Sequence, residues 1–230
     1  MKTPIAITIG CATLGLSVLA ATPAQASHYS LDTMSSDMMS ASQARALGVA
    51  GDHVRTFGYG SGVNEIPDVI WLCDLDGTKE VVVDGSPELY GVAYSSEKSR
   101  TETVAGQELH AFNTEADARQ AMKAIRKAAT KCSGTFTVKD DQGWTITQKA
   151  SHGQGKTSDG NGFVWIKQVA TSADAQTGVA ESEYNTFRRV GEFIQVISIE
   201  VAGPKETKIT SSQIKTADQL TGTLGAYWAW

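Results

Sequence analysis

The chain has 230 residues, with 41% hydrophobic and 20% charged side chains and a formal net charge of −5 at pH 7. This mildly acidic composition, which has no basic cluster, excludes nucleic acid and anionic lipid as expected partners. The length is sufficient for one domain with a hydrophobic core.

The N-terminus has the features of a secretory signal peptide over residues 1–26. A single lysine precedes an apolar run, and a small-x-small pattern ends at Ala26. The run is short and interrupted by glycine, which disfavours a transmembrane helix. We therefore expect cleavage between Ala26 and Ser27, a secreted extracellular chain and no stable membrane insertion. Cys11 leaves lipidation open, although the residues before it match the lipidation pattern poorly.

Two cysteines remain after removal of the signal segment, Cys73 and Cys132. Two cysteines in an exported chain most often form one disulfide. A bridge that closes a loop of this length stabilises a fold by about 4 kcal/mol in the chain-entropy model. A zinc site is not expected, because no histidine lies near either cysteine in the sequence.

The first half of the chain after the signal predicts one helix followed by strands. Residues 27–35 are a flexible lead-in, and 36–230 form a single α+β domain. A helix is expected from Ser36, as its cap, to the stop at Gly48. Strands are expected over 69–73, on both sides of a turn at 85–87, and over 107–113.

The segment 113–132 predicts the clearest helix. Thr114 and Asp117 form a start that resembles a capping box. Apolar residues recur at helical spacing up to Cys132, which lies on the apolar face.

The remainder predicts a β-meander and a closing helix. Strands are expected over 135–139, 144–150 and 163–170, followed by a hairpin about Gly191. A last helix is expected from about Thr216, its predicted cap. The fold class is therefore α+β, with a mainly antiparallel sheet and packed helices. The loose phosphate-loop match over 150–158 is rejected, because a strand and not a helix follows it.

The stretch VIWLCDLDGTKE, residues 69–80, resembles the nucleophile strand of a haloacid-dehalogenase-type phosphatase. The resemblance implies Asp74 as nucleophile and Asp76 as general acid, with Mg²⁺ bound by Asp74 and one of Asp140 or Asp141. That catalytic core is a parallel sheet whose connections need long crossovers. The residues after Asp76 have room for a hairpin flap but not for a flap and a helix. The phosphatase is therefore kept as an alternative only.

A second resemblance covers about residues 36–230. A strand ending in Phe112 precedes a helix that begins with Ala116, Asp117 and Ala118 and finishes at Cys132. This arrangement, with the later segment RRVGEFIQVISIE, resembles the PknH-like extracellular sensor domain family. Its members are exported or membrane-tethered actinobacterial domains.

The resemblance implies a non-enzymatic sensor-type domain without cofactors, in which Cys73 is the partner of Cys132. Family members commonly carry a second disulfide, and this chain has no cysteine after Cys132. The difference puts any ligand cleft that the second bridge would shape in doubt.

The function expected is therefore a secreted ligand-binding or sensor domain whose unknown partner is a small molecule, a cell-wall component or a protein. A structural or protein-interaction role through the terminal YWAW is a further alternative. Five aromatic residues are weak candidates for lining a groove, with ordinary core packing as the alternative for most of them: Tyr90, Tyr94, Trp144, Trp165 and Tyr184.

Overall fold

A computed structural model provides the structure of the chain. It describes residues 38–50, 53–59, 69–75, 79–84, 88–98, 100–139, 145–172, 179–204 and 207–225. The predicted signal peptide, its cleavage site at Ala26 and Ser27, and Cys11 lie outside the described residues, so these expectations stay predictions.

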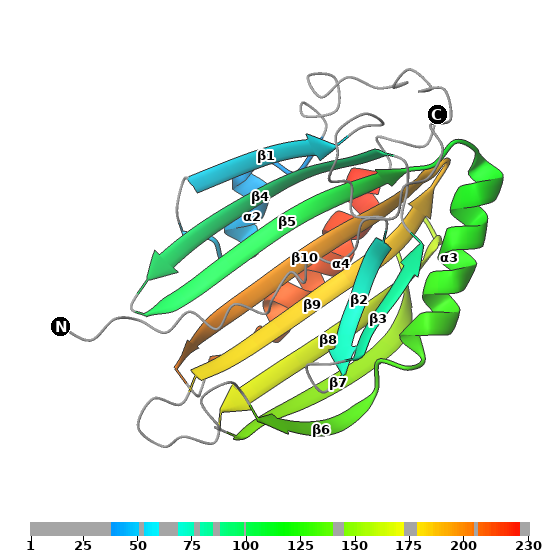
Figure 1. Cartoon of the computed structure of the whole chain (residues 1–230). Coiled ribbons are helices and arrows are strands. Elements are labelled where there is room, and N and C mark those ends of the chain that lie inside the picture. The colour runs from blue at the N-terminus through cyan, green and yellow to red at the C-terminus, as the bar shows by residue number, and fades with distance from the viewer. Residues whose placement is uncertain are drawn as a thin grey trace.

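One eight-stranded sheet dominates the structure, in the order β1-β4-β5-β10-β9-β8-β7-β6, and a separate two-stranded sheet pairs β2 with β3 (Figure 1). Every strand pair in the described residues is antiparallel. The strands are β1 His53–Tyr59, β2 Val69–Leu75, β3 Lys79–Asp84, β4 Glu88–Lys98, β5 Thr101–Ala111, β6 Gly134–Lys139, β7 Thr145–Lys156, β8 Gly162–Ser172, β9 Val179–Val190 and β10 Phe193–Pro204.

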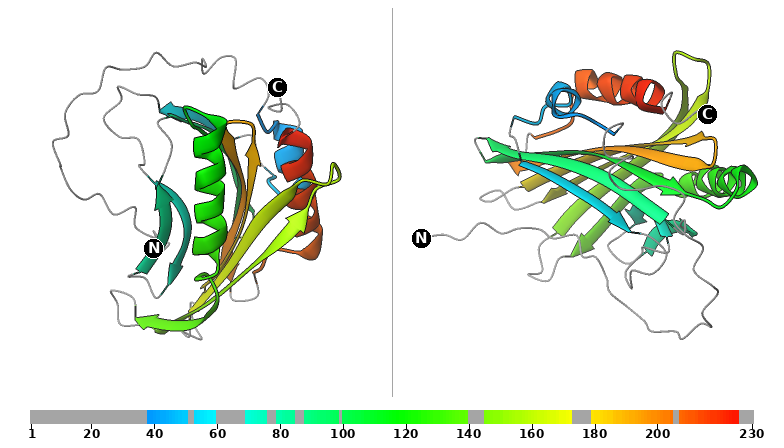
Figure 2. Two further views of the ribbon diagram at one scale, coloured as in Figure 1. Left: turned by 90° about the vertical axis from the view of Figure 1, so that its right-hand side faces the viewer. Right: turned by 90° about the horizontal axis from the view of Figure 1, so that it is seen from above.

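Both faces of the large sheet are covered (Figure 2): one by a helix and the small hairpin, the other by two helices. The helices are α2 Ala41–Ala46, α3 Glu115–Ala129 and α4 Ser211–Gly225. We call the face that carries α3 and the β2–β3 hairpin the hairpin face, and the face that carries α2 and α4 the helix face. The predicted mainly antiparallel sheet is confirmed, and the three helices on its faces are compatible with the predicted α+β class.

Each face is sealed by its own apolar cluster. On the helix face, a cluster that includes Leu109, Ile197 and Ile199 packs under α2 and α4. On the hairpin face, Phe187 and Ile194 belong to a cluster that α3 and the hairpin cover. Alternate residues of β9 and β10 serve the two clusters, as the period of a pleated strand requires.

The two terminal helices begin at caps that differ from those predicted. Ser40, not Ser36, caps α2, and its capping box with Gln43 is complete. At α4, the Gln213 amide donates to Thr210 Oγ1 at 3.2 Å, and the Thr210 amide donates to Gln213 Oε1 at 2.8 Å. Thr216 lies inside α4 and donates to the carbonyl of Ser212. The prediction of Thr216 as cap was therefore wrong. Both threonines have a glutamine three residues later, but the reciprocal capping bonds form at Thr210 with Gln213, so the helix begins before Thr216.

Helix α3 begins at Thr114, as predicted, with the Asp117 amide donating to Thr114 Oγ1. Its apolar face is buried on the sheet and ends near Cys132. Cys132 is bonded to Cys73 of β2, across a sequence separation of 59 residues. The predicted disulfide is confirmed, and it joins the hairpin to the end of α3.

The glycines of the rejected phosphate-loop match have a packing role in β7. Gly153 lies opposite Trp165 and Gly155 opposite Phe163 on the neighbouring strand. A Cβ at either glycine would come within 2.4 Å of the ring opposite. The glycines therefore make room for aromatic rings that lie across the sheet.

No helix within the described residues is both long enough and apolar enough to cross a membrane.

Candidate functional site

The hairpin and α3 cover only part of the hairpin face, and the strand register places the remaining residues in rows. One row crosses the sheet through Val104, Glu200, Glu183, Gln168 and Ala150. The next row outward runs through Glu102, Ala202, Glu181, Ala170 and Gln148. These rows are polar and acidic, in contrast to the apolar row through Val196, Phe187 and Val164 under the cover.

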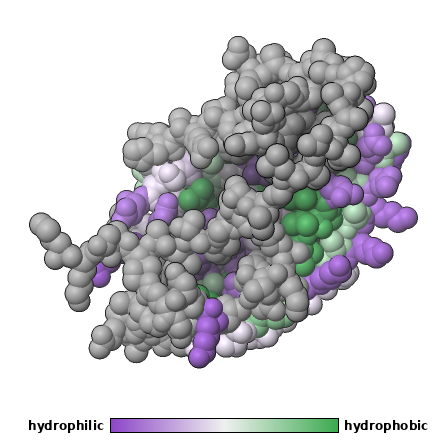
Figure 3. All heavy atoms as spheres, viewed as in Figure 1, coloured by the Kyte–Doolittle hydropathy of each residue, from purple (hydrophilic) through white to green (hydrophobic). Residues whose placement is uncertain are grey.

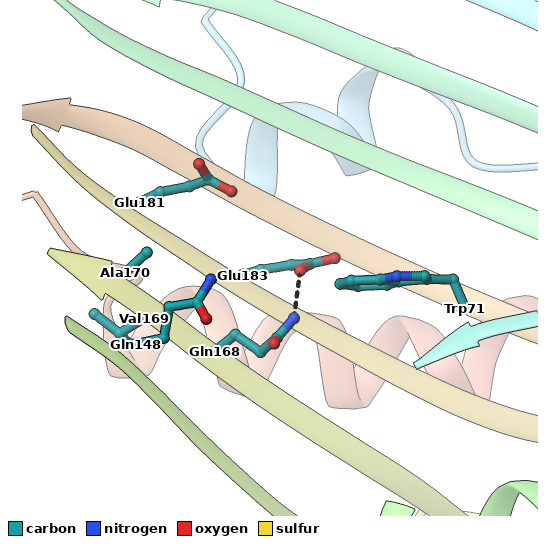
Figure 4. A pocket seen from close by; sticks show the side chains of 7 residues that line it. All are labelled: Trp71, Gln148, Gln168, Val169, Ala170, Glu181 and Glu183. Atoms are coloured by element: carbon teal, nitrogen blue, oxygen red, sulfur yellow. Dashed lines mark hydrogen bonds between the residues drawn. The ribbon is translucent and has the colours of Figure 1, made fainter. Parts of the chain in front are cut away.

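A depression lies where these two rows meet the edge of the hairpin. We call it the acidic groove, and it is lined by Trp71, Gln148, Gln168, Val169, Ala170, Glu181 and Glu183. The hollow is small, about 20 Å³, which is room for roughly one water molecule, and it is open to solvent on one side. Figure 4 shows the carboxylates of Glu181 and Glu183 on the same side of β9, with the Trp71 ring at one end. Ala170 lies beside Glu181 on the neighbouring strand, and its small side chain leaves open the space that forms the hollow.

The covering elements differ in polarity along the rim. Figure 3 shows apolar side chains over the β2–β3 hairpin and hydrophilic ones along α3. Val69 and Val82 of the hairpin are the large apolar side chains exposed among the described residues, at 38% and 36%. On α3, a shallow and solvent-exposed depression is lined mainly by Arg119, Lys123 and Lys127, which make this part of the surface basic.

Glu183 is held at the centre of the groove floor by two amide donors. Asn185 Nδ2 donates to one carboxylate oxygen at 2.7 Å, and Gln168 Nε2 donates to the other at 3.1 Å (Figure 4). Burial raises the pKa of Glu183 to about 7, and the nearby Glu200 and Glu108 carboxylates add to the rise, while the two amide bonds oppose it. Glu183 therefore titrates near neutral pH.

The neighbouring carboxyl groups are shifted in the same direction. Burial, followed by repulsion from Glu200 and Glu183, raises the pKa of Glu181 to about 7. The pKa of Glu200 is also raised, by burial and then by Glu102. Carboxylates directly opposite or diagonal on one face of a sheet repel one another, as Glu183 and Glu200 do here.

Among the described residues, two acceptor oxygens at or behind the groove have no hydrogen-bond partner: Gln148 lines the groove, and Asn185 lies behind the lining residue Glu183. Gln148 Oε1 and Asn185 Oδ1 are both shielded from solvent and unpaired. Asn185 is 5% exposed, and its amide nitrogen is already used by Glu183. An unpaired buried carbonyl costs about 1–3 kcal/mol, so these atoms are expected to have a partner that the chain does not supply.

A second polar cluster lies on the helix face and is structural. The Arg188 guanidinium donates to the carbonyls of Thr221 and Gly222 in the last turn of α4, each at 2.9 Å, and to Asp159 at 2.5 Å. A cation at this position satisfies carbonyls that the helix end leaves free. The pKa of Asp159 is lowered, chiefly by its hydrogen bond from Thr157.

Four of the five aromatic residues predicted as groove candidates are described, and none of these four is among the residues that line the acidic groove. Tyr90, Tyr94 and Tyr184 are buried in the helix-face cluster, and partly buried Trp165 stacks on Tyr184 with ring centroids 6.1 Å apart. The core alternative is what the structure shows for the three tyrosines. Trp144 lies outside the described residues.

The phosphatase alternative falls partly outside the described residues. Asp74 lies in β2, opposite Glu80 of the antiparallel partner β3. Asp76, Asp140 and Asp141 lie outside the described residues, so their roles and the Mg²⁺ site stay untested predictions. Within the described residues, no three His, Cys, Asp or Glu side chains are placed together to hold a metal ion.

Sequence reasoning missed the residues that line the groove. Glu181 and Glu183 stand two apart in a predicted strand, a spacing that puts both carboxylates on one face. The predicted hairpin about Gly191 also places Glu200 opposite Glu183. Only Trp71 carried no signal, because its position depends on how the β2–β3 hairpin lies on the large sheet.

Comparison with known proteins leaves the family open. No family model matches the chain, and no curated protein matches it. Among solved structures, the extracellular domain of PknH from Mycobacterium tuberculosis is similar at 13% sequence identity and a TM-score of 0.49, over 86% of this chain and 97% of that one. The resemblance to the sensor domain family stays a prediction at this level of similarity, and the function is argued from the acidic groove.

Proposed function

We propose that the mature protein is an exported, non-enzymatic domain that binds a small molecule in the acidic groove. The observation that carries this proposal is the pair Glu181 and Glu183, two carboxyl groups set in a hollow of the sheet with pKa values near 7. In their ionised forms, the two carboxylates lower the free energy of unfolding. Titratable groups with strongly shifted pKa values that lie in a depression are typical of functional sites.

The placement of the two carboxylates favours binding over catalysis. Both project from one strand, so they would lie on the same side of a ligand (Figure 4). Carboxylate pairs that cleave a bond generally flank it from two sides. Among the described residues that line the groove, none carries a hydroxyl, thiol or imidazole group.

The disulfide supports the exported part of the proposal. Bridges such as Cys73–Cys132 persist in oxidising compartments outside the cytosol. The bridge also anchors the hairpin that carries Trp71, so an oxidising environment would preserve the rim of the groove.

The proposal is tested by an NMR screen of the oxidised protein against amino acids, amines, sugars and small carboxylic acids. The signals to follow are the Trp71 indole N–H and the Gln148 and Gln168 side-chain amides, each assigned by its loss in a substituted variant. We expect at least one class of compound to shift these signals in a saturable way. If no compound shifts them, or if every binder shifts signals elsewhere, the proposal is wrong.

A further inference from the structure

We propose that the acidic groove takes a small organic cation that carries N–H donors, such as a primary ammonium or a guanidinium group. This inference rests on the proposed function and names its ligand class. Three independent features of the groove lead to it: the acceptors that are left free, the sign of the surrounding charge, and the ring at its end.

The free hydrogen-bonding atoms on the groove floor are acceptors. Gln148 Oε1 and Asn185 Oδ1 have no partner. The amide donors of Asn185 and Gln168 are already directed at Glu183, whose oxygens each keep a second lone pair. A ligand that satisfies this floor must therefore donate hydrogen bonds. Asn185 is 95% enclosed by protein and donates to Glu183 from behind, but it is not one of the lining residues. Gln148 Oε1 is therefore the unpaired acceptor that a ligand in the groove can reach.

The charges that act on the groove are all negative. Every charge that shifts the pKa of Glu181, Glu183 or Glu200 belongs to another carboxylate. On the strands beneath, Lys149 and Lys167 lie at positions of opposite pleat to Gln148 and Gln168, and Arg189 is paired with Glu115. Among the described residues no cation balances the groove, so a cationic ligand would offset the repulsion and the cost of burial.

Trp71 adds a ring suited to the same ligand. Its indole lies at the end of the groove beside Glu183 (Figure 4). An ammonium or guanidinium group next to a tryptophan face is attracted by the ring quadrupole. A metal ion fits the site less well, because the acidic side chains of the described residues do not converge as metal ligands.

The test is an NMR titration with four small aliphatic probes of different charge and a metal salt, at pH 8 and low ionic strength. Butylamine and butylguanidine carry the cation, butanol is neutral, butyrate is an anion, and MgCl₂ supplies the metal alone. We expect the two cations to shift the Trp71 indole and Gln168 amide signals, and the other three to leave them unchanged.

Matched variants locate the binding to the groove. Glu183→Gln keeps the shape and removes the charge, and we expect it to weaken butylguanidine binding by about tenfold or more, as loss of a charged partner does. Glu97 is exposed at the end of β4, opposite Glu102 of the outer row, and lies three strands away from Glu181. We expect Glu97→Gln to change the affinity by less than about twofold, since an exposed charge at a distance is screened by solvent.

The outcomes separate this inference from the proposed function. If butanol or butyrate shifts the groove signals and the cations do not, the cation assignment is wrong and the ligand-binding function stands. If MgCl₂ alone shifts them, the groove is a metal site and the inference is overturned. If neither these probes nor the wider screen shifts them, both proposals fail. Equal binding by wild type and Glu183→Gln would overturn the assignment to this groove.

Discussion

At the scale of single residues, Glu183 shows why the groove costs stability. It lies directly opposite Glu200 across β9 and β10, and two amides hold its carboxylate in place. Like charges opposite one another in a sheet are destabilising, and burial adds to the cost. The chain therefore keeps a charge pattern at this position that folding alone does not favour.

The first prediction concerns the pH dependence of stability through Glu183. Its pKa is raised from the ordinary 4.5 to about 7, so the folded state holds a proton that the unfolded state releases between these values. Its contribution is fully present below about pH 4.5 and is lost as pH rises through 7. We expect the free energy of unfolding to fall between pH 5 and pH 8, measured by urea denaturation. Glu183→Gln should fall less and be more stable than wild type at pH 8.

Glu97→Gln is the matched control, and its free energy of unfolding should follow wild type across the same range. A Glu183→Gln variant with an unchanged slope would mean that Glu183 is ionised at both pH values.

The second prediction compares two adjacent arginines of β9. The Arg188 side chain is 3% exposed and bonds two carbonyls of α4 and Asp159, whereas that of Arg189 is 30% exposed and pairs with Glu115. We expect Arg188→Met to lower the free energy of unfolding by about 3–5 kcal/mol, because it leaves buried partners unpaired. Arg189→Met should cost about 0–1 kcal/mol. Equal costs in thermal or urea unfolding would contradict the burial argument.

At the scale of elements, helix caps determine where two helices begin, and one disulfide bond holds the β2–β3 hairpin in place. The capping boxes at Ser40 and Thr210 fix the starts of α2 and α4. The Cys73–Cys132 bridge ties a hairpin of two strands, which is marginal alone, to the longer helix α3. The hairpin then holds Trp71 at the groove.

The third prediction tests the corrected start of α4. Thr210→Ala removes the cap of the helix and should cost about 1 kcal/mol. Thr216→Ala is the internal control, because Thr216 bonds only to the carbonyl of Ser212 within the same helix and alanine has the higher helix propensity. Its cost should be near zero in the same denaturation experiment. A larger loss from Thr216→Ala would support the cap expected from the sequence.

The fourth prediction concerns the disulfide. Replacing Cys73 and Cys132 together by alanine should lower the free energy of unfolding by about 4 kcal/mol for a loop of 59 residues. Amide hydrogen exchange should quicken most in β2 and β3, while the pairing of β9 with β10 stays protected. Uniformly faster exchange in all strands would show that the bridge stabilises the whole sheet instead of the hairpin.

At the scale of the whole molecule, local patterns predict most elements but not their arrangement. The apolar repeat and the cap at Thr114 predict α3 closely, and the turn at Gly191 predicts the β9–β10 hairpin. Gly191 has a φ of 55°, which a two-residue hairpin turn requires at its first position. Once that turn is placed, the pairing of Glu183 with Glu200 follows from counting residues.

The sheet order and the full groove depend on contacts that no local pattern carries. Strand β5 pairs with β10 although most of the chain between them forms other strands and α3. The hairpin β2–β3 leaves the large sheet altogether, and its position over β8 and β9 brings Trp71 to the acidic rows. The aromatic residues were predicted as weak candidates for lining a groove without knowledge of these contacts. In the structure, Tyr90, Tyr94 and Tyr184 pack in the core.

The central claim is that the acidic groove binds a cation through ionised carboxylates, and proton release on binding tests it most directly. Glu181 and Glu183, with pKa values of about 7, must lose bound protons when a cation occupies the groove at neutral pH. Calorimetric titration with butylguanidine at pH 7, in phosphate and in MOPS, measures that release from the difference in heat between the buffers. We predict net proton release, and an affinity that rises from pH 5.5 to pH 8 in wild type and much less in Glu183→Gln. Binding without proton release, with the same affinity at both pH values and in both proteins, would contradict the account.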